Sequence, residues 1–413
     1  MTRLSSCLRE TVAPARRWIA AAARATALSA PLLLAGCAAT STSLLPVTTA
    51  PMQLFDDSGF APPSAPIDPA GVLALSPAMR TYLEKQILPA ARVLGVREAL
   101  TDQLYNRSKL ELEYEATMTR NASEAFDART GNCLSLVIMT GAFAKAMGLR
   151  VTYQQVSVDE MWSRAGDMYF MSGHVNLQLE RRQSEMFMRY DRTGLYTIDF
   201  LPVSESVGLH THSISEETIL AMYMNNRAAE AMVAGQLDDA YARAKQAIRL
   251  DPSFLSAYNT LGVIYQRHGD AGRAEQVLRY VVDRVPDNPR VLANYVDTLR
   301  KLGRDAEAGA IQARLAKLEP YPPFYFFNRG QAALKAGDLV GARDWFKKEL
   351  DRSPDYHEFH YWLAVADFGL GRVDEARSEL AIALQDAVQR SDRDLYAVKL
   401  DKLKAYRQAT KVQ

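Results

Sequence analysis

Cysteine is scarce in this chain: among 413 residues there are three, Cys7, Cys37 and Cys133. So few cysteines exclude a small scaffold held together by disulfide bonds. An excess of charge of one sign is also lacking, because 49 lysine and arginine residues face 48 aspartate and glutamate residues. Without a basic excess to neutralise phosphates, we expect no nucleic acid as a partner. Apolar residues make up 48% of the chain, which excludes a disordered protein.

The N-terminal 36 residues carry several arginines and then one short apolar run, residues 25–36. This run is too short for a helix that crosses a bilayer, which needs about 20 residues. A basic region followed by a short apolar run is typical of a secretory signal peptide, here residues 1–36. When the net charge of +4 in this segment is removed from the +1 of the chain, −3 remains.

The apolar run ends in Leu34-Ala35-Gly36-Cys37. This ending resembles the lipobox of bacterial lipoproteins, which implies cleavage before Cys37 and attachment of acyl chains such as palmitate. Two or three acyl chains hold a protein firmly to a membrane leaflet, at about 0.8 kcal/mol per buried methylene. Because Ala38 and not aspartate follows, the lipoprotein sorting pattern favours the outer membrane of a bacterial envelope, facing the periplasm. An ordinary secreted protein, cut near Ala35, is the alternative.

The segment after the lipobox, residues 37–75, is rich in Thr, Ser, Ala and Pro. Such a composition favours a flexible, partly extended chain. We therefore expect a lipidated tether that lets the folded part stand away from the membrane.

A repeat with a period of 34 residues fills the C-terminal half. A glycine, an alanine and a proline recur with this spacing, at Gly235, Gly269, Gly303, Gly337 and Gly371, at Ala240, Ala274, Ala308, Ala342 and Ala376, and at Pro252, Pro286, Pro320 and Pro354. We expect the glycine in the turn between two antiparallel helices, the alanine where helices approach closely, and the proline after the second helix. The pattern resembles tetratricopeptide repeats, whose first-helix signature matches Leu261-Gly262 and Tyr265.

This resemblance implies an all-α solenoid of about five helix pairs over residues 215–390, followed by a capping helix and basic tail at 391–413. Such arrays offer a concave groove, so we expect a protein or peptide partner there. Structural support for the other domain alone is the alternative. His357 and His360 lie close together in sequence, but further ligands at suitable spacing are missing, so we expect no metal.

The middle of the chain contains a cysteine at the start of a predicted buried helix. Asn132 is a suitable N-cap and Gly148 a suitable terminator, which predicts a helix over residues 133–147. Its first residue is Cys133, and the positive end of the helix dipole favours a nucleophilic thiolate there.

Other elements of this region are predicted from periodicity. A helical pattern runs over residues 111–125, and alternation predicts strands at 151–158 and from His174 onward. A hairpin at 191–194 leads into a strand that carries Asp199. His210 and His212 lie beyond it, in a predicted linker.

Three pieces of this region resemble the transglutaminase-like branch of the papain-like cysteine fold. They are Arg129-x-Gly131-x-Cys133, Gly173-His174-Val175-Asn176 and Ile198-Asp199. The resemblance implies an α+β domain over residues 76–208 that needs no cofactor. It also implies that Cys133 is the nucleophile and His174 the general base and acid. Asp199 would orient the imidazole, with Asp191 as the rival for this role.

Two functions of different kinds fit these features. The first is a membrane-tethered cysteine hydrolase or acyltransferase that acts on amide bonds of a peptide or protein recruited by the repeats. The second is an envelope adaptor without catalysis, in which the repeats bind a client and the middle domain is a binding module. Because the repeats begin soon after Asp199, we expect them to lie near the thiol. We also expect a chain cut after residue 212 to keep its reaction with small substrates.

Overall fold

A computed structural model describes residues 49–411, apart from residues 107, 111, 116–117, 166–167, 181–194, 201–209 and 388–389. The predicted signal peptide, the lipobox with Cys37 and the first part of the tether lie outside the described residues. Asp191 and the hairpin around it lie outside them too. Among the helices that are described, none combines the length and the apolar character needed to cross a membrane.

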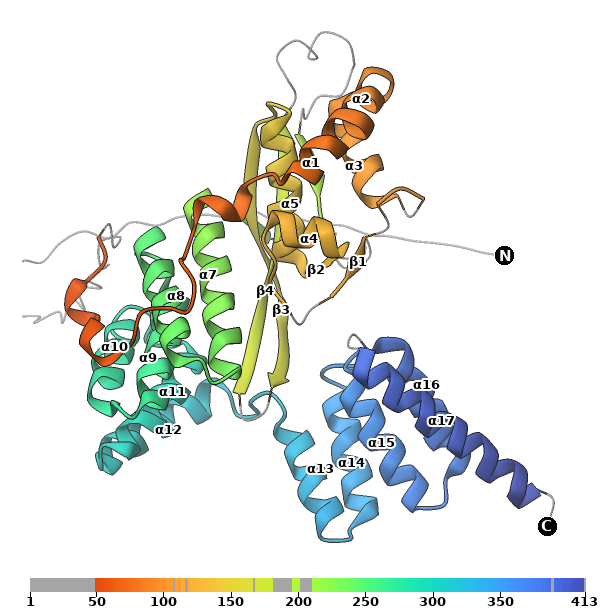
Figure 1. Ribbon diagram of the computed structural model, residues 1–413. Helices are drawn as coiled ribbons and strands as arrows, with labels where there is room; N and C mark the ends of the chain where they lie inside the picture. The colour runs from red at the N-terminus through yellow and green to blue at the C-terminus, as the bar shows by residue number, and fades with distance from the viewer. Residues whose placement is uncertain are drawn as a thin grey trace, which may run out of the picture. The chain divides into compact units, whose positions relative to one another are not determined.

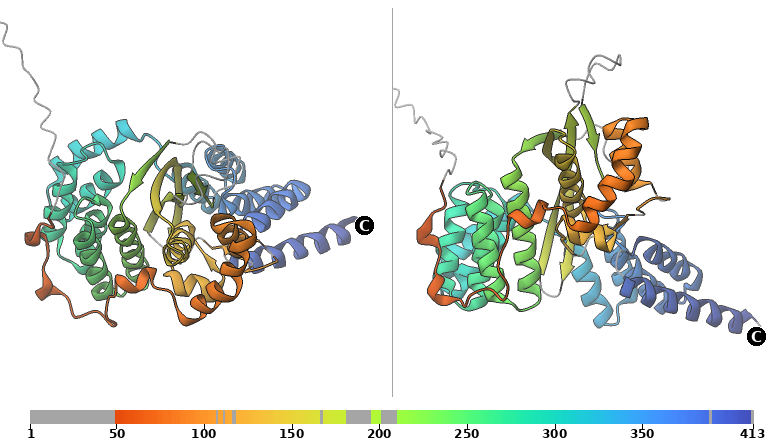
Figure 2. Two further views of the ribbon diagram at one scale, coloured as in Figure 1. Left: turned by 90° about the horizontal axis from the view of Figure 1, so that it is seen from above. Right: turned by 45° about the horizontal axis from the view of Figure 1, so that its top comes forward.

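Residues 51–64, which we call the N-terminal strap, are folded onto the repeats and are not the flexible tether that we expected. The strap includes two short 3-10 helices, η1 (Met52–Leu54) and η2 (Asp57–Gly59), and it runs along the first repeat helices in both views (Figures 1 and 2). The aromatic ring of Phe60 stacks on that of Tyr241 with centroids 4.0 Å apart. The backbone carbonyl of Leu54 accepts a hydrogen bond from the hydroxyl of Tyr265. The prediction from composition is wrong here, because the few apolar side chains of the strap pack against aromatic side chains of the repeats.

Polar contacts fix the same segment. The carboxylate of Asp57 forms an ion pair with Lys245 and accepts a hydrogen bond from the hydroxyl of Tyr241 at 2.9 Å. Farther along, both the backbone N–H and the hydroxyl of Ser64 donate to the carboxylate of Asp239, each at 2.6 Å. Polar contacts as well as aromatic ones therefore fix the strap to the repeats.

The region between the strap and the repeats combines helices with a four-stranded antiparallel sheet (Figure 1). Its helical elements are the 3-10 helix η3 (Ala70–Leu73), α1 (Pro77–Tyr82), the π-helical turn η4 (Leu83–Ile87), α2 (Leu88–Leu94), α3 (Val96–Tyr105), α4 (Ala122–Ala128) and α5 (Cys133–Ala146). The sheet has the order β5-β4-β3-β6, with β3 (Val151–Ala165), β4 (Met168–Glu180), β5 (Leu195–Ile198) and β6 (His210–Ile214). A separate pair of short parallel strands, β1 (Glu113–Tyr114) and β2 (Thr130–Gly131), precedes α5.

Helix α5 forms the centre of this region, and its predicted position is confirmed. It begins at Cys133, and the side chain of Asn132 caps it by accepting a hydrogen bond from the backbone N–H of Ser135 at 2.9 Å. All but its last two residues are buried. The helix packs against β3 and β4, which explains why its sequence is apolar on nearly every side.

Two local predictions are wrong. Residues 111–125 are not one helix: β1 lies at Glu113–Tyr114, residues 118–121 are not helical, and α4 begins only at Ala122. The reason is a capping box, in which Asn121 and Glu124 bond to each other's backbone N–H groups and so fix the helix start. His210 and His212 are not in a linker, because they belong to β6, which pairs with β3.

The C-terminal half consists of helix pairs, as the 34-residue period predicts. Among the described residues the pairs are α7 (Glu216–Val233) with α8 (Leu237–Leu250), α9 (Leu255–His268) with α10 (Ala271–Val282), α11 (Pro289–Lys301) with α12 (Asp305–Leu318), α13 (Tyr325–Lys335) with α14 (Leu339–Leu350) and α15 (His357–Gly369) with α16 (Val373–Asp386), followed by α17 (Arg390–Lys411). The glycine in each turn has a φ between 69° and 96°, a conformation that favours glycine. The five repeating alanines are all buried where helices meet.

The hydrophobic core divides along the solenoid and not between the two predicted domains. One cluster of buried side chains extends from the strap through α5 and the sheet to α12. A second cluster begins at Phe324 and includes α13, α14 and α15, and a third joins α15, α16 and α17. The first three helix pairs therefore share one core with the mixed α/β region.

Candidate active site

Cys133 lies buried at the first position of α5. Its side chain is 7% exposed, and its Sγ lies 3.8 Å from the backbone carbonyl oxygen of Gly173 on β4. The first N–H groups of a helix have no acceptor within that helix, and the Asn132 cap takes up only that of Ser135. The backbone N–H of Cys133 can therefore serve an oxygen that carries negative charge beside the thiol.

The structure brings His174 and Asp199 together with Cys133. His174 lies on β4 and is 1% exposed, and its Nε2 is 2.6 Å from Oδ1 of Asp199, which follows directly after β5. The side-chain amide of Asn176 donates a hydrogen bond of 2.7 Å to the other oxygen, Oδ2, of the same carboxylate. Both oxygens of Asp199 are thus engaged, which fixes the carboxylate toward the imidazole.

The ionisation of His174 is strongly perturbed. Burial of the ring disfavours its charged form, but hydrogen bonds to Asp199 and to the thiol of Cys133, together with the charges of both groups, outweigh burial and raise the pKa of His174 to about 9. Since the pKa exceeds the ordinary value of 6.5, protonation of the ring stabilises the fold fully below pH 6.5. This stabilisation is lost as the pH rises through about 9.

Tyr114 is a neighbour of the thiol that the sequence did not identify. It lies on β1, where it pairs with Gly131, two residues before Cys133. Partial burial and the negative charge that Cys133 acquires both raise the pKa of Tyr114 above its ordinary value. The phenol therefore stays neutral and keeps a proton that it can donate near the sulfur.

Asn176 and Thr119 were not predicted as residues of the site either. Asn176 belongs to a quoted motif, but only the structure shows that it holds Asp199. Thr119 lies in the loop before α4, a range that we predicted as helical. The local sequence could not indicate a role for Thr119, because its side chain contacts residues more than ten positions away in sequence.

The inner surface of the repeats contains a groove of about 1100 Å³. Side-chain amides from successive first helices line it, including Asn226 on α7, Asn259 on α9 and Asn294 on α11. The amide of Asn294 donates to that of Asn259 at 2.9 Å, so the first helices of these two neighbouring repeats are connected. Such amides can both donate to and accept from a peptide backbone.

His357 and His360 are engaged by protein groups. Nδ1 of His360 lies 2.6 Å from the carboxylate of Glu379, and Nδ1 of His357 lies 2.9 Å from the hydroxyl of Tyr396. Within the described part of the chain, histidine, cysteine and acidic side chains do not gather in a group of three or more that could hold a metal ion.

Comparison with known proteins finds tetratricopeptide repeats in the C-terminal half. Models of the tetratricopeptide repeat match residues 225–289, 259–323 and 333–399. A TPR repeat-containing protein of Pseudomonas aeruginosa is 26% identical over 198 residues, which are 47% of this chain and 32% of that protein. A TPR repeat-containing thioredoxin of Arabidopsis thaliana is 33% identical over 75 residues, 18% of this chain and 11% of that protein. The matched region thus spans about a third of the first relative and about a tenth of the second.

Solved structures give matches of the same kind. A thermophilic TPR protein from Thermus thermophilus shares 20% identity, with 44% of this chain and 98% of that chain covered and a TM-score of 0.29. The pilF protein of Pseudomonas aeruginosa shares 21% identity, with 47% and 88% covered and a TM-score of 0.30. The transglutaminase-like resemblance of residues 76–208 stays a prediction. The family models and the 34-residue spacing show that the C-terminal half of this chain is a solenoid of tetratricopeptide repeats, which typically bind protein or peptide partners.

Proposed function

We propose that this protein is a cysteine hydrolase or acyltransferase that acts on amide bonds of a peptide or protein bound by its repeats. The observation that carries the proposal is the 2.6 Å contact between His174 and Asp199, with the thiol of Cys133 near enough to help raise the pKa of the same imidazole. A cysteine, a histidine and a carboxylate in this order of contacts are the groups that nucleophilic thiol catalysis requires. The transglutaminase-like resemblance supports the same assignment.

The proposed reaction starts from a thiolate–imidazolium pair, in which the ring of His174 holds the thiol proton of Cys133. Since Nε2 of His174 is bound by Asp199, its Nδ1 is the atom that accepts this proton. The sulfur attacks the carbonyl carbon, and the backbone N–H of Cys133 donates to the oxygen of the tetrahedral intermediate. The imidazolium then protonates the leaving amine, the C–N bond breaks and a thioester remains. Water, or a second amine in the transferase, attacks the thioester carbon and gives a proton to His174. The C–S bond then breaks, the acid or the new amide leaves, and His174 passes that proton to the sulfur.

Replacement of His174 tests the proposal without knowledge of the substrate. In the full chain, peptide mass spectrometry follows the alkylation of Cys133 by iodoacetamide as a function of pH. We expect rapid alkylation at pH 6.5 in the wild type, because the pKa of His174 is raised to about 9 and the protonated ring stabilises a thiolate beside it. In His174→Gln the rate at pH 6.5 should fall about 100-fold, since a thiol without a partner has a pKa of about 8.5. Equal pH profiles in the two proteins would contradict a thiol–imidazole pair.

The same experiment separates the enzyme from the adaptor without catalysis. The adaptor is favoured by the groove of about 1100 Å³, because a binding surface of this size needs no reaction at Cys133. An adaptor requires only that Cys133 fills space in the core, so its alkylation would be slow and indifferent to His174. Slow alkylation in both proteins therefore supports the adaptor.

We assign Tyr114 the role of second donor to the oxygen of the tetrahedral intermediate. Removal of one such donor costs about 10²- to 10³-fold in other enzymes, and for this partly exposed phenol we expect kcat to fall about 10- to 100-fold in Tyr114→Phe. KM should change little, because the hydrogen bond forms only as charge develops. Tyr321→Phe is the matched control, since Tyr321 is an exposed tyrosine in the repeats. A Tyr114→Phe variant that keeps full kcat would remove the tyrosine from the mechanism.

We further propose that acyl chains on Cys37 anchor the protein to the outer membrane, with the folded domains in the periplasm. The lipobox at the end of the apolar run supports this proposal. In a Gram-negative host fed with labelled palmitate, the wild type should incorporate the label. Cys37→Ser should lose it, because the acyl-accepting sulfur is gone. Cys133→Ser is the matched control and should keep the label, whereas a label that persists in Cys37→Ser would place the lipid elsewhere.

A further inference from the structure

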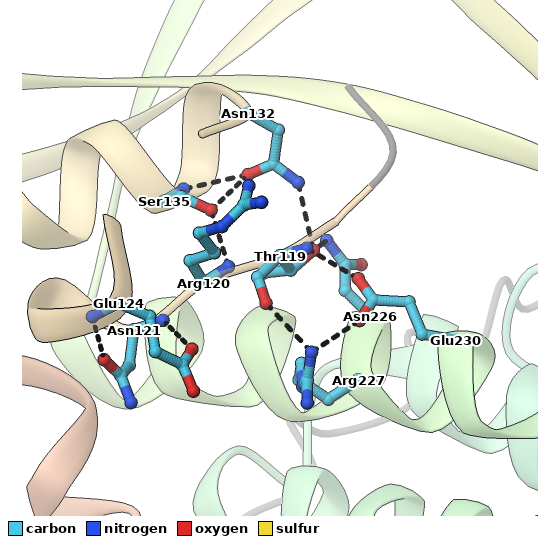
Figure 3. Close-up of polar contacts among 9 residues, drawn as sticks. All are labelled: Thr119, Arg120, Asn121, Glu124, Asn132, Ser135, Asn226, Arg227 and Glu230. Atoms are coloured by element: carbon cyan, nitrogen blue, oxygen red, sulfur yellow. Dashed lines mark hydrogen bonds and ion pairs between the residues drawn. The ribbon is translucent and has the colours of Figure 1, made fainter. Parts of the chain in front are cut away.

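The loop that precedes α4 holds a buried threonine, Thr119, which is 2% exposed. Its hydroxyl oxygen accepts two hydrogen bonds from two different parts of the chain (Figure 3). One comes from the side-chain amide of Asn132 at 3.0 Å, and the other from that of Asn226 at 3.3 Å. Thr119 therefore connects the residue that caps the Cys133 helix with the first helix of the repeats.

On the side of the thiol, the bond from Asn132 orients the cap of α5. The side-chain oxygen of Asn132 accepts from both the backbone N–H and the hydroxyl of Ser135, and that hydroxyl in turn accepts from the backbone N–H of Arg120. The amide of Asn132 can point its oxygen at Ser135 because its nitrogen is bound by Thr119. The next residue after this cap is Cys133, so the cap sets where the helix and its thiol begin.

On the side of the repeats, α7 holds the backbone of the same threonine. The carboxylate of Glu230 accepts from the backbone N–H of Thr119 at 2.7 Å, and Arg227 donates to its backbone carbonyl at 3.3 Å (Figure 3). Arg227 and Glu230 also pair with each other at 2.9 Å. Asn226, which directly precedes Arg227, donates to the hydroxyl of Thr119 and also lines the groove of the repeats. The side chain of Asn226 thus lines the groove and also contacts Thr119, which holds the cap of the Cys133 helix.

We propose that Thr119 is a positioning residue for Cys133 and that Asn226 connects it with the groove, so that a polypeptide segment bound there changes the reactivity of the thiol. This inference rests on the proposed thiol–imidazole pair and adds a control of it by the repeats. A segment that forms a hydrogen bond with the amide of Asn226 competes with the bond to Thr119. Loss of the Asn226–Thr119 bond then alters the position of Thr119, which alters its bond with Asn132 and so the cap at the start of α5.

The test measures the pH profile of Cys133 alkylation by iodoacetamide in the full chain, with peptide mass spectrometry. Thr119→Val keeps the shape and the backbone contacts but removes the hydroxyl, and we expect the rate at neutral pH to fall about fivefold as the cap loosens. Thr119→Ser keeps the hydroxyl and should restore the wild-type profile. Asn226→Ala should lower the rate about threefold, within the range of coupling through a packed contact.

A double variant and a groove control complete the design. If Asn226 acts through Thr119, Asn226→Ala should have no further effect when Thr119→Val is already present. Asn259→Ala should leave the profile unchanged, since Asn259 lines the same groove but bonds with Asn294. Thermal unfolding of each variant shows that the fold is retained.

The outcomes separate this inference from the proposed function. A wild-type profile like that of an ordinary thiol would overturn both. If the wild-type profile is that of a thiol paired with His174, but neither Thr119→Val nor Asn226→Ala changes it, this inference alone is overturned. Additive effects of the two substitutions would show that Asn226 does not act through Thr119, and would also overturn it.

Discussion

A Cys133→Ala variant is expected to lose at least about 10³-fold in kcat/KM on any ester or amide that the wild type hydrolyses, because no other group forms the covalent intermediate. The free energy of unfolding should fall by no more than about 1 kcal/mol, since only one sulfur atom at the edge of the core is removed. Hydrolysis of p-nitrophenyl acetate measures the first quantity, and thermal unfolding measures the second.

Cys37→Ser is the matched control for this variant. It also removes one sulfur, but from the segment before the strap, so turnover by the folded domains should be unchanged. Full turnover in Cys133→Ala, or an equal loss in Cys37→Ser, would exclude Cys133 as the nucleophile.

A chain that ends after residue 212 is expected not to fold, in contrast to the expectation from the sequence. Helix α7 buries Ile219, Tyr223 and Met224 in the same core cluster that contains α5. Each such side chain contributes about 1.5–3 kcal/mol, and a domain has only about 5–15 kcal/mol in total. The cut also removes the contacts of α7 with the Thr119 backbone. Circular dichroism should therefore show no cooperative thermal transition.

A chain that ends after residue 319 is the matched comparison. It keeps α7–α12 and the whole first core cluster, and it loses only the repeats that belong to the second and third clusters. We expect cooperative unfolding and wild-type alkylation of Cys133. A folded chain ending after residue 212, with a reactive thiol, would show that the mixed α/β region does not depend on the repeats.

Periodic features of the sequence predicted the solenoid well. The turn glycines and the buried alanines repeat because every helix pair has the same geometry, so each repeat confirms the others. The start of α5 was equally clear, because Asn132 and a long apolar run are local signals. The structure also brings Cys133, His174 and Asp199 together, although their catalytic roles stay a proposal.

Features that depend on distant contacts were not predictable in this way. The strap is poor in apolar residues, and its order comes from aromatic side chains about 180 residues later in sequence, such as Tyr241. The loop around Thr119 resembled part of a helix, because its fold is decided by α7 and by the cap of α5. The shared core of the repeats and the α/β region has the same origin, and it explains why the predicted boundary at residue 208 does not separate two independent folding units.

The central claim is that Cys133 forms a thioester, and intact-protein mass spectrometry tests it most directly. The full chain is mixed with p-nitrophenyl acetate at neutral pH and sampled over time, beside Cys133→Ala and His174→Gln. We predict that the wild type gains one acetyl group on Cys133 within the first turnover and then loses it as water attacks the thioester. Cys133→Ala should gain none at this position, and His174→Gln should gain it far more slowly. A wild-type chain that never carries acetyl on Cys133, while the ester is consumed at the same rate by Cys133→Ala, would contradict the account.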